Sequence, residues 1–246
     1  MSKDFNLSYS KLNTFHTCPY RYYLQYIEKK KGIAISTFKS GEIYHRVIEN
    51  FWNSKRYASL SYNFDAEANL LLDEFETVLN KENVKTDKGL TQKIVINFLT
   101  HAKEVDSIIQ EIAGVEKSFK YKVSENIVVK GKIDFAFIDK NNTLHVVDYK
   151  TGKNIPELDN AGIMCNFDDK LQLDMYNLAS RLAFPKYNNV KCSLYFLRFG
   201  KEIPAINTSF AQVRNYLLSE VSKITNAKEF NKITKWCNYC TFREIC

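Results

Sequence analysis

The sequence predicts an α/β domain with a helical front end, and two changes in residue pattern along the chain are the basis of that prediction. Apolar residues recur every three or four positions through residues 1–113, which is typical of amphipathic helices. From Gly114 onward the chain changes to short runs of β-branched and aromatic residues separated by turn signals, which is typical of strands. Beyond residue 168 helical and strand patterns alternate, so helices and a sheet are expected to pack on one another.

The elements are expected in the following order. The first helix begins after Ser8 or Ser10, and Pro19 either breaks it or stands in a first turn. Three further helices are expected at about 38–56, 65–82 and 90–113. Three strands in a meander are expected within 115–123, 127–139 and 143–151, followed by a helix at 168–184, a strand pair within 190–208 and a helix at 209–230.

The bulk properties narrow the class of protein. The net charge of +7, from 35 basic and 28 acidic residues, suits a polyanionic partner such as nucleic acid without requiring one. No run of eighteen apolar residues exists, so no membrane-spanning segment is expected. The first residues lack the apolar stretch of a signal peptide, which predicts a cytoplasmic protein. In that reducing compartment the six cysteines are expected to be thiols or metal ligands rather than disulfides.

The stretch from 131 to 153 carries the clearest chemical pattern. Asp148 and Lys150 share one face of their strand because side chains alternate along it. A three-residue loop, 140–142, would pair residue 134 with 148 and place Asp134 on that same face, whereas a two-residue loop would separate the two aspartates. Two carboxylates and an ammonium on one surface can hold Mg²⁺ or Mn²⁺ and assist an attacking water, although a salt-bridged strand pair is the alternative.

Other polar residues are ambiguous when each is taken alone. His45 lies inside a predicted helix, where a histidine is more often structural than catalytic. Gln172 and Tyr176 stand four residues apart, on one face of the helix at 168–184. Glu116 opens the first predicted strand and is a possible auxiliary residue.

Four cysteines have the spacing of a metal site. Cys237, Cys240 and Cys246 form a C-x₂-C-x₅-C pattern at the end of the chain, and Cys18 near the start could supply the fourth thiolate. Four thiolates satisfy either tetrahedral Zn²⁺ or a 4Fe–4S cluster, and the spacing does not choose between them. The remaining two, Cys165 and Cys192, are expected to be bystander thiols.

Taken in order, these pieces resemble the PD-(D/E)xK nuclease superfamily, and within it the RecB-like branch. The matching segments are LSYSKLNTFHTCPYRYYLQY, GEIYH, VEKSF, GKIDF, VVDYKTG and QLDMY. The cysteine arrangement resembles that of the iron–sulfur members of this branch, which include the AddB-type nuclease domain and the CRISPR-associated RecB-like exonucleases.

The resemblance implies a restriction-endonuclease-like core with a mixed central β-sheet flanked by helices. It implies one nuclease domain over 1–246, with a helical front (1–113), a core (114–208) and a C-terminal segment (209–246) that closes a cysteine clasp with Cys18. The implied catalytic residues are His45, Asp134, Asp148 and Lys150. The implied Mg²⁺ or Mn²⁺ ligands are His45, Asp134, Asp148 and the backbone carbonyl of Tyr149. Gln172 and Tyr176 would bind substrate. The implied ligands of a 4Fe–4S cluster, with structural Zn²⁺ as the alternative, are Cys18, Cys237, Cys240 and Cys246.

The expected function is therefore that of a metal-dependent deoxyribonuclease, an exonuclease acting on single-stranded DNA or duplex ends. Its partners would be DNA and a helicase, recombination or CRISPR adaptation protein, with no membrane. A different class remains open, in which the same fold is a non-catalytic DNA-binding or architectural subunit of a helicase–nuclease or CRISPR adaptation complex. A restriction-type endonuclease ranks lower, because no separate recognition domain is evident in the sequence.

Overall fold

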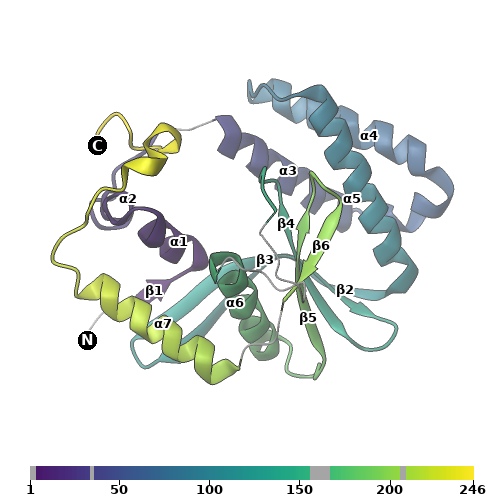
Figure 1. Ribbon diagram of the computed structural model, residues 1–246. Coiled ribbons are helices and arrows are strands. Elements are labelled where there is room, and N and C mark those ends of the chain that lie inside the picture. The colour runs from purple at the N-terminus through teal and green to yellow at the C-terminus, as the bar shows by residue number, and fades with distance from the viewer. Residues whose placement is uncertain (1–3, 34–35, 156–166, 206–208) are drawn as a thin grey trace. The chain divides into compact units, whose positions relative to one another are not determined.

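The structure is a computed structural model that describes residues 4–33, 36–155, 167–205 and 209–246 (Figure 1). The chain folds into two compact units. The terminal unit comprises Met1–Ile35, Ser118–Gly131 and Asn207–Cys246, and the central unit comprises Ser36–Lys117 and Lys132–Ile206. The predicted single nuclease domain over the whole chain stays a prediction.

The secondary structure follows the predicted order, with a few differences. The elements are β1 (Phe5–Leu7), α1 (Tyr9–Thr17), α2 (Pro19–Tyr22), a π-helical turn (Tyr23–Ile27), α3 (Ser36–Asn53), a 3₁₀ turn (Arg56–Ser59), α4 (Leu60–Lys81), α5 (Lys88–Ile108), β2 (Ile109–Ser124), β3 (Ile127–Asp139), β4 (Leu144–Lys150), α6 (Phe167–Ala183), β5 (Val190–Phe196), β6 (Lys201–Pro204), α7 (Phe210–Thr225) and a second 3₁₀ turn (Thr234–Tyr239).

Two helices end earlier than predicted, and one strand was not predicted. The helix expected to reach residue 113 ends at Ile108, because the isoleucine-rich stretch that follows is extended and enters β2, which pairs with β3. The last helix ends at Thr225 rather than at 230. The front end also contains a strand, β1, which is only three residues long and is formed by parallel pairing of Phe5 with Ile127 and Leu7 with Val129.

The central unit is built on a mixed sheet. Its strand order is β3-β4-β5-β6, with β3 antiparallel to β4, β4 parallel to β5, and β5 antiparallel to β6. Helices α3, α4 and α5 share a buried apolar core with one face of β3, β4 and β5. Within that core Trp52 stacks on Phe135 with ring centroids 3.9 Å apart, and its indole N–H donates to the Tyr149 hydroxyl at 3.2 Å.

Helix α6 packs against β4 and β5. Along β4 the side chains alternate, so Val147 and Tyr149 belong to the core shared with α3–α5, and Asp148 points to the face that α6 covers. The polar residues of the two central strands therefore come together opposite the aromatic core.

The terminal unit joins the first and last helices of the chain. His16 of α1 and Lys223 of α7 both contact the buried carboxylate of Glu220, each at 2.6 Å. Burial raises the pKa of Glu220, but the hydrogen bonds and charges of these two partners outweigh it, so the pKa lies below its ordinary value. Arg214 of α7 also donates to the backbone carbonyl of Val123 at 2.7 Å.

In the described parts of the chain, no helix combines the length and the apolar character needed to cross a lipid bilayer.

Candidate active site

The β3–β4 hairpin brings the two aspartates to one face. Phe135 pairs with Val147 and Ile138 with Leu144, a register that puts residue 134 opposite residue 148. Residues 139 and 143 close a three-residue loop, through a hydrogen bond from the Asp139 N–H to the Thr143 carbonyl at 3.0 Å. The predicted loop length and the predicted shared face are therefore confirmed.

The loop sequence explains this register. Asn142 adopts a left-handed conformation with φ of 58°, which asparagine tolerates and which three-residue hairpin loops require at this position. The Asp139 carboxylate accepts hydrogen bonds from the N–H groups of Asn141 and Thr143, at 2.9 and 2.8 Å, and pairs with the His145 ring at 3.0 Å. Local polar contacts at the turn thus fix the position of a pair of carboxylates at the other end of the strands.

Asp134 is held by the backbone and by a helix. One carboxylate oxygen, Oδ2, accepts the N–H of Tyr149 at 2.9 Å and lies 3.2 Å from Nδ1 of His45 on α3. Burial raises the pKa of Asp134, and the nearby charge of Asp148 raises it further. Burial alone would lower the pKa of His45, but Asp134, Asp148 and Glu116 outweigh that effect and raise it. This corner of the site therefore attracts positive charge.

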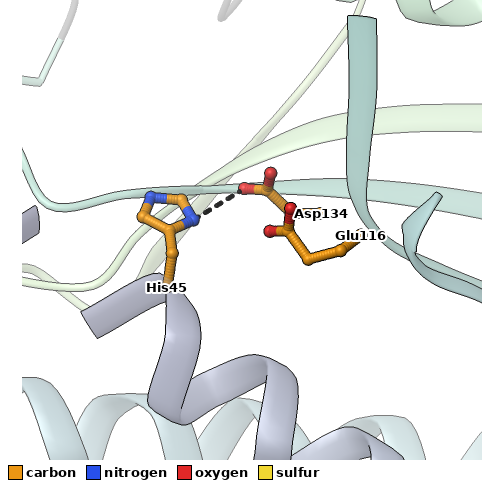
Figure 2. A group of neighbouring side chains, drawn as sticks. All are labelled: His45, Glu116 and Asp134. Atoms are coloured by element: carbon orange, nitrogen blue, oxygen red, sulfur yellow. Dashed lines mark ion pairs between the residues drawn. The ribbon is translucent and has the colours of Figure 1, made fainter. Parts of the chain in front are cut away.

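Glu116 completes a group of three possible metal ligands (Figure 2). One ligand atom from each of His45, Glu116 and Asp134 lies within 4.8 Å of the other two, and Figure 2 shows the three side chains pointing toward one another. Glu116 has a φ of 47°, which is rare for a non-glycine residue inside a strand and costs about 1–3 kcal/mol. Its carboxylate is 2.7 Å from the ammonium of Lys132.

Asp148 is held by a separate set of contacts. Its Oδ1 accepts the hydroxyl of Tyr176 at 2.8 Å and the amide of Gln172 at 2.9 Å. Its Oδ2 lies 2.8 Å from the Lys150 ammonium, which also donates to the Gln172 side-chain oxygen at 2.5 Å. Burial and the charges of Asp148 and Asp134 raise the pKa of Tyr176 well above its ordinary value, so this phenol stays protonated and donates.

The structure thus brings the residues expected in the nuclease site into the central unit. Gln172 and Tyr176 share a helix face, as predicted, but both are buried and contact Asp148. Their predicted contact with substrate stays a prediction. Lys132, whose ammonium reaches Glu116 beside the site, was not among the residues expected from the sequence. The available signal was strand alternation, since 132 and 134 share a face.

One pocket in the terminal unit is lined by four cysteines, Cys18, Cys237, Cys240 and Cys246. This pocket has a volume of about 380 Å³, open solvent included, and its other lining residues include Arg21, Leu24 and Phe242. Two backbone N–H groups point at sulfur atoms: that of Ile233 lies 3.5 Å from Cys18 Sγ, and that of Phe242 lies 3.4 Å from Cys240 Sγ.

The two other cysteines do not join this pocket. Cys192 is buried in β5, and burial raises its pKa to about 12, so it is an inert thiol. Cys165 lies outside the described residues.

Two carboxylates and a lysine on neighbouring strands of a mixed sheet, with a histidine reaching them from a flanking helix, are groups that can hold a divalent metal ion and assist the hydrolysis of a phosphate ester. A family model described as the PD-(D/E)XK nuclease superfamily matches residues 6–246 of the chain. The chain belongs to this superfamily, as expected from its motifs.

Two similar proteins carry a name that fits a nuclease family. A subunit of the ATP-dependent helicase/deoxyribonuclease of Streptococcus mutans is 27% identical over 168 residues, which cover 64% of this chain and 15% of that protein. The corresponding protein from Clostridium kluyveri, of the same name, is 26% identical over 235 residues, which cover 82% of this chain and 19% of that protein. The chain therefore spans less than a fifth of the length of these two relatives.

A solved structure has the same fold. A candidate exonuclease from Eubacterium rectale superposes with a TM-score of 0.58 at 10% identity, over 98% of this chain and 89% of that one. At this identity the likeness concerns the fold, which confirms the expected restriction-endonuclease-like architecture.

Proposed function

We propose that the protein is a deoxyribonuclease that depends on a divalent metal ion and hydrolyses phosphodiester bonds, acting as an exonuclease on single-stranded DNA or duplex ends. The observation that carries the proposal is the convergence of His45, Glu116 and Asp134, next to Asp148 and Lys150. Membership of the superfamily supports a nuclease, and both relatives are named as parts of a helicase/deoxyribonuclease.

The donor set suits Mg²⁺ or Mn²⁺. Carboxylate oxygens are the ligands that these ions prefer, and an imidazole is acceptable to Mn²⁺. His45, Asp134, Asp148 and the backbone carbonyl of Tyr149 would hold the ion, with Glu116 as the auxiliary ligand. When bound, such an ion lowers the pKa of a water molecule and offsets the charge that develops on the phosphoryl oxygens.

The protein's own residues prepare the site for this chemistry. The Tyr149 N–H keeps Asp134 oriented, and Tyr176 with Gln172 keeps Asp148 oriented. A fixed geometry of this kind lowers the reorganisation needed during the reaction. Lys150 is partly exposed beside Asp148, where its ammonium can orient the attacking water or stabilise charge on the phosphoryl group.

The test is degradation of end-labelled DNA by the purified chain. Linear single strands and blunt duplexes should shorten with Mg²⁺ or Mn²⁺ and stay intact with EDTA, and covalently closed circles should resist. Asp148→Asn, which keeps the shape of the side chain, should abolish cleavage, whereas Asp65→Asn on the exposed surface of α4 should leave it unchanged. An Asp148→Asn protein that degrades DNA as fast as the parent would refute the assignment.

A second candidate function is that of a DNA-binding protein that does not cleave and serves within a larger complex. It is favoured by the net charge of +7, and the two relatives are named as subunits of a helicase/deoxyribonuclease. A helicase, recombination or CRISPR adaptation partner fits either candidate. DNA that binds but stays intact under every divalent metal tested would favour this second function.

For the cysteine pocket we propose a 4Fe–4S cluster rather than zinc. A tetrahedral zinc ion with Zn–S bonds of about 2.3 Å holds its thiolates about 3.8 Å apart. Among the described residues, however, the cysteines form no group of three whose sulfurs lie within 4.8 Å of one another. The sulfurs are therefore not spaced for a zinc ion, and the cluster is favoured by the resemblance of this cysteine arrangement to that of the iron–sulfur members of the RecB-like branch.

The test is the metal content of protein purified without oxygen. The parent should be brown and contain iron, and Cys240→Ser or removal of Cys246 should release the iron and lower the melting temperature. Cys192→Ser is the matched control and should keep the cluster. A colourless parent with one zinc per chain would overturn the cluster, and a chain without Cys246 that keeps its metal and melting temperature would overturn the clasp.

A further inference from the structure

Lys132 stands beside the candidate metal site. It precedes Asp134 by two residues on β3, so both side chains leave the same face of the strand. Its ammonium lies 2.7 Å from the Glu116 carboxylate. The hydrogen bond and charge of Glu116 raise the pKa of Lys132, and the charges of Glu49 and Asp134 contribute further.

The two members of this ion pair differ in exposure. The Glu116 side chain is 17% exposed and faces His45 and Asp134, whereas the Lys132 side chain is 57% exposed. The Glu116 carboxylate is thus the more buried member of the pair, and it already lies with the other candidate ligands. Lys132, by contrast, can move its ammonium through solvent on a flexible stem.

A divalent cation and Lys132 would compete for Glu116. Both are attracted by the same carboxylate, and a double positive charge placed next to the ammonium would repel it. Since Lys132 is more than half exposed, it can leave at little cost. The most favourable new partner for a displaced ammonium beside a nuclease site is a phosphate of the bound strand.

We propose that Lys132 is a positioning residue that pairs with Glu116 until a divalent cation binds there, and that its ammonium then moves to a phosphate of the nucleic-acid substrate. This inference rests on the proposed nuclease function. It implies that metal and DNA each strengthen the binding of the other, because the coupling between two sites is reciprocal.

The first test measures Mn²⁺ affinity in the absence of DNA, from the electron paramagnetic resonance signal of the free ion. Lys132→Met removes the competing ammonium and should bind Mn²⁺ about three- to tenfold more tightly than the parent. Lys132→Arg keeps the charge, and Lys103→Met removes a charge from the exposed surface of α5, so both should match the parent. In a Glu116→Gln background, Lys132→Met should have no effect.

The second test measures DNA binding by fluorescence anisotropy of a short labelled single strand, with Ca²⁺ or EDTA, and checks on a gel that the strand stays intact. Ca²⁺ should tighten binding to the parent about threefold more than binding to Lys132→Met. Circular dichroism establishes that each variant is folded.

Several outcomes would overturn the inference. In the first, Lys132→Met binds Mn²⁺ no more tightly than the parent. In the second, Lys132→Met still tightens Mn²⁺ binding in the Glu116→Gln background. In the third, Ca²⁺ tightens DNA binding equally in the parent and in Lys132→Met. If the parent cleaves DNA and any of these outcomes is found, only the role of Lys132 is overturned. A parent that neither binds Mn²⁺ nor cleaves DNA overturns the proposed function as well.

Discussion

The burial of His101 predicts that the free energy of unfolding falls in mild acid. It lies on α5, is 3% exposed, and stacks on Tyr195 with ring centroids 4.1 Å apart. Within the described residues its Nε2 has no hydrogen-bond partner. Burial therefore disfavours the imidazolium and lowers the pKa of His101 from 6.5 to about 4.

The sign and size of the effect follow from these two pKa values. Because the unfolded chain binds a proton at His101 more readily than the folded chain, folding is favoured by the neutral ring. The contribution is complete above pH 6.5 and is lost as the pH falls toward 4. The loss reaches about 2 kcal/mol at pH 5 and about 3 kcal/mol below pH 4.

The assay compares the parent with His101→Phe, which keeps an aromatic ring against Tyr195 but cannot titrate. Urea unfolding is followed between pH 7 and pH 5 by the fluorescence of Trp52, which is fully buried in the core of the central unit. Trp236, the second tryptophan in the sequence, is replaced by Phe in both proteins. The parent should lose about 2 kcal/mol more of its free energy of unfolding than the variant.

The comparison isolates His101 because all other titrating groups are common to both proteins. Equal pH dependence in the parent and the variant would refute the reasoning. A parent that becomes more stable than the variant as the pH falls would show that the buried ring is protonated in the folded protein.

Three further substitutions test the hairpin loop, the packing of Gly131 against Phe119, and the site. Asp139→Ala removes the acceptor of three hydrogen bonds, so urea unfolding should show that the free energy of unfolding falls by about 3 kcal/mol. Because the pKa of Asp139 is lowered in the folded protein, this difference between parent and variant should shrink as the pH falls below 3.8. Gly131→Ala places a methyl group 2.6 Å from the Phe119 ring and should lower the melting temperature, at a cost of about 1–3 kcal/mol, whereas an unchanged value would show that the ring moves freely. Tyr176→Phe removes a donor to Asp148 and should slow DNA cleavage about tenfold without a matching loss of DNA affinity; loss of affinity alone would instead favour the predicted substrate contact.

The shared face of the two aspartates could be predicted because a hairpin is a local structure. A loop of three residues with asparagine in its last position determines the register of both strands, and all of that information lies within 131–153. The pair Gln172 and Tyr176 was equally accessible, since a four-residue spacing on a helix places two side chains on one face.

Features that depend on distant pairing could not be predicted. The stretch from Ile109 to Ile112 fits helical spacing, yet it is the beginning of β2, a strand that pairs with β3. The three residues of β1 are too few to show alternation. Lys132 and Glu116 lie 16 positions apart on two strands, and the left-handed backbone at Glu116 shifts the direction of its side chain in a way that no residue pattern records.

The contact between Asp134 and the N–H of Tyr149 has a consequence for sequence variation. A main-chain donor is supplied by every amino acid except proline, so the orientation of the carboxylate does not depend on which side chain occupies position 149. That side chain is constrained instead by the core in which it is buried and by the Trp52 indole N–H that its hydroxyl accepts. A replacement of the Tyr149 side chain is therefore expected to disturb the core before it disturbs the orientation of Asp134, whereas proline would remove the N–H donor itself.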